Sequence, residues 1–231
     1  MSIQFTAADY EALAISYLAQ QFTEHNSAVL CGGTGLYIKA LIEGLDEMPP
    51  VSELTVKETE NEYNTHGLAW LQATVQAEDP EFYATGEIHN PARLLRALSF
   101  IRSTGSSIVN YRTNTHKQRP FHMIKVALEL PRETLYKHIN QRTDKMMAQG
   151  LLKEAEQLYP YRHLKSLQTV GYAELFDFLD GKYPLPVAIS KIKQHTRNYA
   201  KRQLTWLRKL PDVELVDVTD RSPDEVAAAL Q

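Results

Sequence analysis

Two glycines and a hydroxyl-bearing residue, Gly32, Gly33 and Thr34, follow directly after a short apolar run. A strand, a glycine turn and a helix in this order let backbone N–H groups approach a phosphate or another ligand closely. The same residues also suit a tight strand-to-helix turn in which Thr34 serves only as the N-cap. The chain contains no G-x-x-x-x-G-K-[ST] sequence, so this turn is not a phosphate-binding loop of that type.

A second feature is a basic stretch in a chain whose net charge is −3. Between Asp180 and Asp212 there is no acid, and the cations there are Lys182, Lys191, Lys193, Arg197, Lys201, Arg202, Arg208 and Lys209. Apolar residues recur at steps of three and four over 185–209, which predicts a helix with one packed side. The cations lie mostly off that side and form a one-sided basic surface. Such a surface suits a phosphate backbone; the alternative is a solubilising face.

Arginines on two other predicted helices also suit phosphate. Arg93 and Arg96 are three residues apart in NPARLLRAL and share one face, where phosphate contact and plain solvent exposure are equally consistent with the sequence. Arg142 lies in INQRTDKMMAQGLLKEAEQL, where it either holds a phosphate through its guanidinium fork or forms a surface pair one helical turn away. The histidines and the single cysteine show no metal-ligand spacing.

The elements that position these residues follow an α/β pattern that helices interrupt. We expect strands near 27–31, within 122–130 and in the tail 213–220. We expect helices over 7–24, 36–45, 132–159, 170–180 and 185–209, with two further helices starting at Asp79-Pro80 and Asn90-Pro91. The sequence therefore predicts α/β core parts at 1–47 and 121–231, separated by a helical insertion domain at 48–120. The strands are too few for a complete parallel sheet.

Composition limits the class of protein. The chain is 43% hydrophobic and 23% charged, as ordinary globular proteins are. Its single cysteine, Cys31, excludes an internal disulfide. The sequence shows neither a signal peptide nor an apolar run of the roughly 20 residues that span a bilayer. We therefore expect a cytoplasmic protein that does not interact with membranes.

Four segments in order resemble the tRNA dimethylallyltransferase (tRNA isopentenyl transferase) family. They are GGTGLYIKALIEGL, NPARLLRAL, INQRTDKMMAQGLLKE, and QTVGYAELFDFLDGK followed by TRNYAKRQLTWLRK. The resemblance implies a P-loop-type parallel-sheet core, incomplete here, with a helical insertion domain. It also implies transfer of a dimethylallyl group from dimethylallyl diphosphate to the exocyclic amine of the adenosine just 3′ of the tRNA anticodon, usually with Mg²⁺.

The resemblance also implies roles for individual residues. Thr34 is expected to line the channel near a flipped adenosine, Gly32 and Gly33 to let the backbone come close, and Arg142 to bind the diphosphate. Expected tRNA contacts are Lys57, Ala92, Arg93, Leu94, Leu95 and Arg96 in the insertion; Gln168, Thr169, Val170, Gly171 and Tyr172 at the anticodon; and Lys201, Arg202, Gln203, Leu204, Thr205, Trp206, Leu207 and Arg208 in the basic helix. Lys57 stands in for an arginine that relatives usually carry, and makes a point contact in place of a forked one.

One part of the family pattern is absent from this sequence. Members begin with a phosphate-binding loop, followed by an aspartate that acts as general base, and neither is present here. We therefore expect a further N-terminal segment or a second chain to supply them, and no prenyl transfer by this chain alone. The alternatives are a non-catalytic fragment that binds the anticodon stem-loop, and an adenylate isopentenyltransferase, which shares the fold but acts on free nucleotides.

Overall fold

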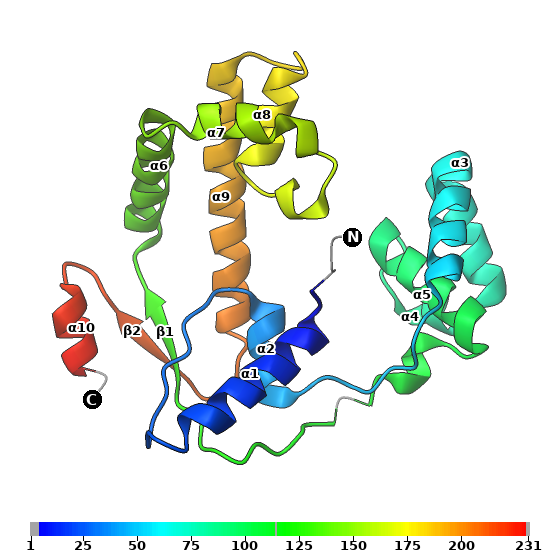
Figure 1. The fold of residues 1–231 in the computed structure, drawn as a ribbon, viewed down its shortest axis with the longest axis horizontal. Helices are drawn as coiled ribbons and strands as arrows, with labels where there is room; N and C mark the ends of the chain where they lie inside the picture. Colours follow the sequence, from blue (N-terminus) through cyan, green and yellow to red (C-terminus); the bar gives the residue numbers. More distant parts are fainter. Residues whose placement is uncertain (1–4, 114, 230–231) are drawn as a thin grey trace. The chain divides into compact units, whose positions relative to one another are not determined.

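The computed structural model describes residues 5–113 and 115–229 (Figure 1). The chain forms two compact units. One comprises Met1–Leu30 and Leu36–Pro120, and the other comprises Cys31–Gly35 and Phe121–Gln231. The boundary after Pro120 is shared with the division expected from the sequence, whereas the expected parts 1–47 and 48–120 fall largely into one unit.

The first unit opens with helix α1 (Ala7–Gln21), whose N-cap is Thr6 in a reciprocal capping box. Helix α2 (Gly35–Glu43) continues in the same unit after its first residue. The rings of Tyr10 and Tyr37 stack with 4.5 Å between their centroids, so an aromatic contact joins the two helices. Both helices were predicted, with bounds that differ by at most three residues.

A buried carboxylate, Glu11, ties α1 to the segments that flank the insertion. Its Oε1 accepts a hydrogen bond from Arg119 at 2.8 Å and lies 3.5 Å from Nζ of Lys117. Its Oε2 accepts the backbone N–H of Leu45 at 3.1 Å. Arg119 also donates to the main-chain oxygen of Leu41 at 2.8 Å, near the end of α2. These bonds fix the chain where it leaves for the insertion and where it returns.

The insertion is helical, as predicted. Its elements are α3 (Glu53–Glu78), α4 (Pro80–Thr85), α5 (Pro91–Thr104) and the 3₁₀ helix η1 (Ile108–Tyr111). Their shared core contains Leu71, Val75, Phe82, Leu94, Ala97, Leu98, Phe100 and Ile108. The predicted helix starts at Pro80 and Pro91 are confirmed. The sequence indicated several short helices over 53–104, but α3 is one long element with a non-helical residue, Gly67, inside it.

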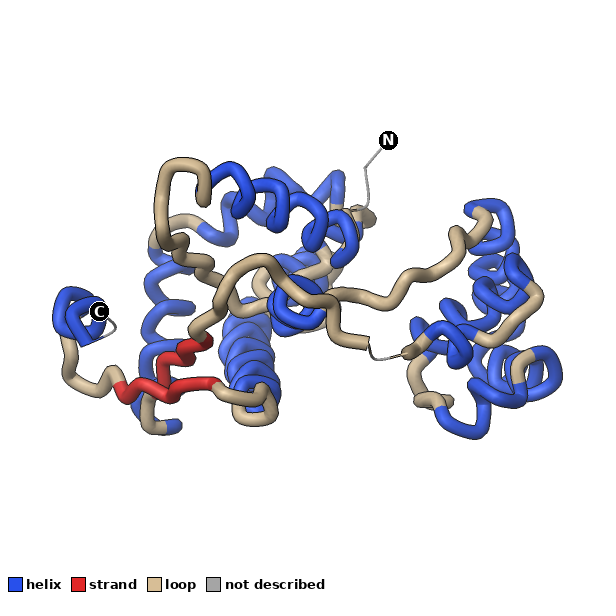
Figure 2. Tube along the Cα trace, turned by 90° about the horizontal axis from the view of Figure 1, so that it is seen from below, coloured by secondary structure: helices blue, strands red, loops and turns tan. Residues whose placement is uncertain are grey.

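The second unit contains a parallel pair of strands, β1 (Lys125–Glu129) and β2 (Val213–Asp217), shown side by side in Figure 2. An α/β chain with a parallel sheet is therefore confirmed, and both strands lie where they were predicted. The strand expected near 27–31 was wrong. Val29 is 90% exposed and Leu30 is 47% exposed, and no described segment pairs with them. Extended backbone without a hydrogen-bonded neighbour does not form a sheet strand.

The helices of this unit pack through their apolar faces. They are α6 (Arg132–Ala148), α7 (Leu151–Leu158), α8 (Tyr172–Leu179), α9 (Leu185–Leu207) and α10 (Pro223–Ala229), with 3₁₀ turns η2 (Tyr159–Tyr161) and η3 (Lys165–Leu167). The core of α7, α8 and α9 contains Leu151, Ala155, Leu175, Phe176, Ala188 and Ile192. One helix was predicted over 132–159, but Gly150 has a φ of 101° and breaks it, because a left-handed residue cannot continue a right-handed helix. Among the described residues, no helix is both long and apolar enough to cross a bilayer.

Candidate functional site

The Gly-Gly-Thr turn lies against the C-terminal half of α9. Nε2 of Gln203 donates a hydrogen bond to the carbonyl oxygen of Gly33 at 2.7 Å. The ring of Trp206 fills the space beside Gly35, where an added Cβ would lie 2.8 Å from Trp206 Cδ2. Thr34, between these two contacts, is exposed, and its hydroxyl makes no hydrogen bond within the described residues. Two segments that are far apart in the sequence therefore form one structural feature with a free hydroxyl in it.

This arrangement revises the prediction for the glycines. A Cβ on Gly33 would lie 2.2 Å from Nε2 of Gln203, so the group that approaches this backbone is a side chain of the same protein. A Cβ on Gly32 would have no atom within 4 Å, so Gly32 remains open to a ligand. The N-cap alternative for Thr34 gains no support, because the hydroxyl does not accept a backbone N–H of α2 within the described residues.

The predicted contact residues on α9 fall into two groups. Lys201, Arg202 and Thr205 are exposed, although the Thr205 hydroxyl donates to the carbonyl of Lys201 at 2.9 Å. The remaining side chains before Arg208 are partly buried, and these are Gln203, Leu204, Trp206 and Leu207. The helix therefore presents only part of this segment to a ligand and uses the rest for packing.

The basic surface is smaller than the sequence predicted. Three of its cations form ion pairs: Lys182 with Asp177, Lys193 with Asp144, and Arg208 with Glu129. Arg197 donates to Oδ1 of Asn140, and Lys191 lies over the Tyr183 ring. Lys201 and Lys209 are exposed without a partner in the described part of the chain. Arg202 lies over the Tyr199 ring at 5.7 Å but has no carboxylate partner there. The cations available to an anion are therefore Lys201, Arg202 and Lys209.

The predicted anticodon segment, Gln168–Tyr172, is a loop that is fixed at both ends. Nε2 of Gln168 donates a hydrogen bond to the carbonyl oxygen of Arg162. The hydroxyl of Tyr172 donates to Glu154, and this hydrogen bond raises the pKa of Tyr172. The Tyr172 ring also stacks on Phe176 with 6.1 Å between centroids. Both end residues therefore have contacts within the protein.

The tip of the Gln168–Tyr172 loop is free. Thr169 and Val170 are exposed, Val170 to 43%, and the Thr169 hydroxyl has no hydrogen-bond partner in the described residues. Gly171 has a φ of 107°, a conformation that favours glycine. The loop thus presents a hydroxyl and an apolar side chain to a ligand.

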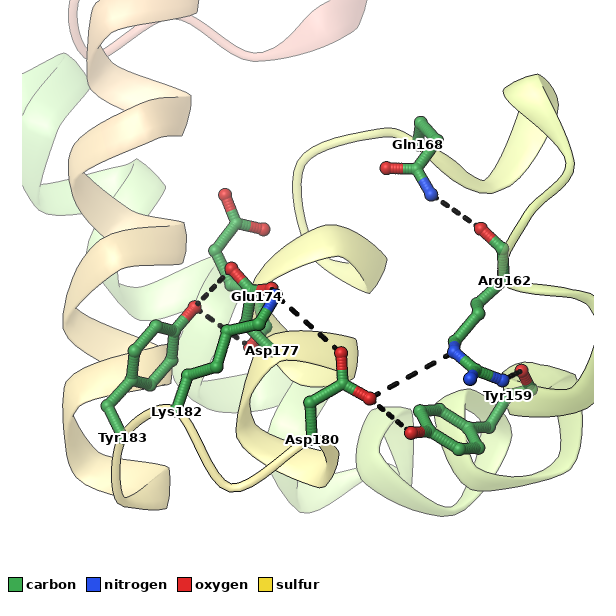
Figure 3. A network of polar contacts seen from close by, with 8 residues as sticks. All are labelled: Tyr159, Arg162, Gln168, Glu174, Asp177, Asp180, Lys182 and Tyr183. Atoms are coloured by element: carbon green, nitrogen blue, oxygen red, sulfur yellow. Dashed lines mark hydrogen bonds and ion pairs between the residues drawn. The ribbon is translucent and has the colours of Figure 1, made fainter. Parts of the chain in front are cut away.

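A cavity of about 470 Å³ adjoins this loop, and several of its lining side chains belong to the polar network drawn in Figure 3. It is lined by Arg162, His163, Gln168, Ala173, Phe176, Asp177, Asp180 and Lys182. The guanidinium of Arg162 lies 4.2 Å above the Tyr159 ring, and the Tyr159 hydroxyl donates to Asp180. That hydrogen bond raises the pKa of Tyr159 and lowers the pKa of Asp180. Lys182 contacts both Asp177 and Asp180, so the acids of this cavity are neutralised within the protein.

Arg142 is exposed on α6 rather than buried. No carboxylate pairs with it in the described residues, so the surface pair considered as the alternative does not form, and its guanidinium is available to an anion. Arg142 and Thr34 are not in direct contact within the described residues, and their membership of one site stays a prediction. The described residues also hold no group of three or more His, Cys, Asp or Glu side chains suited to a metal ion.

In the first unit, the predicted tRNA-contacting side chains of α5 differ in their availability. Ala92, Arg93 and Arg96 are exposed. Arg93 lies 3.1 Å from Glu87, and both side chains are largely exposed, so the pair is weak and open to exchange. Arg96, like Lys57 on α3, has no partner within the described residues. These cations remain available to phosphate.

Leu94 requires a correction. Its side chain is fully buried in the core of the insertion, so it cannot contact a ligand in this conformation. Helical spacing places it beside Ala97 and Leu98, opposite the arginines of the same helix. Leu95 is partly buried and packs against the same core. Their role here is to support α5.

Sequence reasoning missed two residues that support the Gln168–Tyr172 loop. Glu174 is buried in the first turn of α8 and accepts the N–H of Gly171, and His195 of α9 contacts the same carboxylate. Only half of a capping box is present here, the glutamate three residues after the N-cap, because the N-cap Gly171 has no side chain, so the sequence carries only a weak signal for Glu174. No comparable signal exists for His195, because its contact spans two helices.

Comparison with known proteins gives consistent results. The family model described as IPP transferase matches residues 1–210. The chain is 43% identical over 209 residues to tRNA dimethylallyltransferase 1 of Phocaeicola vulgatus, covering 90% of this chain and 70% of that protein. The full-length tRNA isopentenylpyrophosphate transferase from Bacillus halodurans matches with a TM-score of 0.66 and 34% identity, over 99% of this chain and 72% of that one. A eukaryotic dimethylallyltransferase acting on tRNA, at 23% identity, shares the fold with a TM-score of 0.75, over 99% of this chain and 60% of that one.

Proposed function

Because this chain belongs to the IPP transferase family, we propose that it acts in tRNA modification as a dimethylallyltransferase. The acceptor is the exocyclic amine of the adenosine just 3′ of the anticodon, and the donor is dimethylallyl diphosphate. The observation that carries the proposal is the contact between the Gly-Gly-Thr turn and α9 through Gln203 and Gly33. It joins the unpartnered hydroxyl of Thr34 to the helix that carries Lys201 and Arg202.

The reaction makes defined demands on the site. A bond forms between the amine nitrogen and the first carbon of the dimethylallyl group, while the bond from that carbon to the diphosphate oxygen breaks. The bonding electron pair leaves with the diphosphate, and the amine loses a proton to a base. Negative charge grows on the diphosphate, so fixed cations that meet it lower the barrier. The amine is a weak nucleophile and needs the base.

Arg142 and Thr34 are the candidates for contacts with the reacting groups. Arg142 is exposed and has no carboxylate partner in the described residues, and its guanidinium fork matches two diphosphate oxygens. The Thr34 hydroxyl is free to hydrogen bond to the flipped adenosine. We therefore assign diphosphate binding to Arg142 and orientation of the adenosine to Thr34.

Contacts with the rest of the tRNA follow from the free side chains. Lys201, Arg202 and Lys209 suit phosphates, and Thr169 and Val170 at the tip of the Gln168–Tyr172 loop suit unpaired bases. In the insertion, the exposed cations Lys57, Arg93 and Arg96 suit further phosphates. A tRNA substrate also favours the cytoplasm as the site of action.

A Mg²⁺ ion that assists departure of the diphosphate is expected from the family. The described residues hold no group of three or more His, Cys, Asp or Glu side chains suited to a metal ion, and Mg²⁺ commonly binds through one or two carboxylates together with water and substrate phosphates. No step above runs through the metal, and the roles given to Arg142 and Thr34 rest on their own side chains.

The choice of acceptor tests the proposal. A labelled anticodon stem-loop bound to the chain is displaced by unlabelled stem-loop, and AMP in large excess fails to displace it. Displacement by AMP as effective as by the stem-loop would contradict the tRNA assignment and favour an adenylate isopentenyltransferase. The exposed cations Lys201 and Arg202 on α9, with Lys209 just after it, favour tRNA as the acceptor, because they suit several phosphates of an RNA backbone.

Absence of prenyl transfer by this chain alone stays a prediction. It is tested by incubating the chain with tRNA, Mg²⁺ and labelled dimethylallyl diphosphate. Label in the tRNA would contradict the prediction while supporting the proposed reaction. Binding of the stem-loop without incorporation of label is the expected result.

A further inference from the structure

We propose that Glu174 and His195 are positioning residues that hold the Gln168–Tyr172 loop at a fixed place relative to the basic helix α9. The inference rests on the proposed function, because it explains how a loop assigned to the anticodon is supported. Neither residue was among the candidates from the sequence, and neither is needed for the chemistry of the transfer.

Glu174 is a buried acid whose oxygens both have contacts. Its side chain is 5% exposed. Oε2 accepts the backbone N–H of Gly171 at 2.7 Å, and Oε1 contacts Nδ1 of His195. The Glu174 main-chain oxygen accepts the Tyr183 hydroxyl at 3.1 Å. Burial of a carboxyl group is unfavourable unless hydrogen bonds replace its contacts with water. The contacts with Gly171 and His195 therefore stabilise Glu174 at this buried position.

The contact with Gly171 determines the backbone of the loop. Gly171 has a φ of 107°, which turns its N–H toward the carboxyl group of Glu174. The next turn is closed by Ala173, whose N–H donates to the carbonyl of Thr169 at 3.0 Å. With the backbone fixed in this way, the side chains of Thr169 and Val170 are left exposed. The carboxyl group therefore sets which residues the loop presents.

The contact with His195 connects the loop to the helix with the free cations. His195 lies on α9, less than two helical turns before Lys201 and Arg202, and its side chain is 45% exposed. One carboxyl group thus holds the loop with one oxygen and α9 with the other. The spacing between the loop tip and these cations is set by Glu174, which an apolar residue at this position would not achieve.

We call the contacts of Glu174 with Gly171 and His195 the clamp. Hydrogen exchange in the free protein tests the clamp without RNA. Glu174→Ala removes both contacts, so the peptide covering 163–175 exchanges faster than in the wild type. Glu174→Gln keeps an oxygen for the Gly171 N–H and an amide for the imidazole, so exchange stays close to the wild type. Glu156→Ala, at an exposed glutamate of α7 without a partner in the described residues, is the matched control. Unchanged exchange in Glu174→Ala would overturn the clamp.

RNA binding tests the positioning role. Glu174→Ala weakens binding of the anticodon stem-loop by about tenfold. Its salt dependence stays that of the wild type, because the cations of α9 are intact. A stem-loop of equal length with only uridines in the loop loses little affinity. Equal losses for both RNAs would show a merely structural effect and overturn the proposal, as would no loss for either.

The variant His195→Ala tests the contact between Glu174 and α9 separately. Should Glu174→Ala fail to fold, His195→Ala removes only the contact with α9, and it is expected to weaken stem-loop binding while leaving the exchange of Gly171 near the wild type. No difference between His195→Ala and the wild type would overturn the connection to α9. Failure of the wild type to bind any stem-loop would count against the proposed function, whereas the exchange result would still decide the clamp.

Discussion

At the scale of single residues, the absence of a side chain at Gly33 and at Gly35 lets α9 lie close to the turn. Gln203 reaches the carbonyl of Gly33, and Trp206 occupies the space above Gly35. The turn is thus shaped by the protein itself, and Thr34 is left free between the two contacts. Changes at these glycines should therefore differ sharply in their effects.

Gly35→Ala is expected to destabilise the chain. The new Cβ would lie 2.8 Å from the rigid ring of Trp206, and overpacking of this kind costs about 1–3 kcal/mol. Gly32→Ala is the matched control, since its Cβ meets no atom within 4 Å. Urea unfolding measures the free energy of unfolding of the two variants. Equal stabilities of Gly35→Ala and Gly32→Ala would contradict the packing role given to Trp206.

The residues that contact substrate could be predicted from the sequence only in part. The motifs identified the relevant segments, but 201–208 mixes free cations with side chains that pack, and the division depends on where the turn lies. Leu94 was included because a whole segment was carried over from the family. The spacing of Leu94 already placed it opposite Arg93 and Arg96, and this spacing alone predicts that Leu94 does not contact tRNA.

At the scale of elements, positive-φ glycines mark where helices bend and end. Gly67 inside α3 has φ 78° and ψ −170°, a backbone conformation that residues other than glycine very rarely adopt. Gly105 after α5 has φ 73° and ψ 7°, in the ordinary left-handed region. Gly67→Ala is expected to cost about 2–3 kcal/mol, and Gly105→Ala about 1–2 kcal/mol. Neither new Cβ would meet an atom within 4 Å, so backbone strain alone is compared. Urea unfolding measures the free energy that each variant loses. A larger loss in Gly105→Ala than in Gly67→Ala would contradict this prediction.

The bonds of Glu11 make the junction of α1 with the insertion sensitive to acid. Burial alone would raise the pKa of Glu11, but the hydrogen bond from Arg119 and the charges of Lys117 and Arg119 outweigh it, and the pKa is lowered. The stability that this carboxylate contributes is therefore complete above its unfolded pKa and is lost as the pH falls through the lower folded pKa.

Glu11→Gln tests this dependence. The variant is expected to be less stable than the wild type at neutral pH, and the difference is expected to shrink as the solution is acidified below the ordinary glutamate pKa. Urea midpoints across that range measure it. A difference that stays constant with pH would contradict the role given to the charge of Glu11.

The elements were predicted better than their connections. Apolar periodicity and the prolines at 80 and 91 identified most helices, because these are local signals. The break at Gly150 was missed because glycine adopts both helical and left-handed backbone conformations, so its φ cannot be predicted from the sequence pattern alone. The strand near 27–31 was wrong because a strand depends on a neighbour, and its own residues do not supply one.

At the scale of the whole molecule, the α/β class and the helices between 53 and 104 could be predicted from the order of patterns. The net charge of −3 gave no indication of RNA binding, because acids elsewhere mask the basic stretch. The ion pairs of Lys193 and Arg208 were not predictable, since Asp144 and Glu129 lie far away in the sequence, whereas Lys182 pairs with Asp177 only five residues before it. Local charge, reduced by the pairs that the fold forms, is the relevant quantity.

The salt dependence of stem-loop binding tests the central claim most directly. The logarithm of the affinity of the wild type is expected to fall linearly with the logarithm of salt concentration, and the double variant Lys201→Ala/Arg202→Ala to lower that slope by roughly two, as one phosphate contact is lost for each cation. Arg221→Ala removes an exposed cation outside α9 and should leave the slope unchanged. Binding that is indifferent to salt, or a slope that the double variant shares with the wild type, would contradict the account.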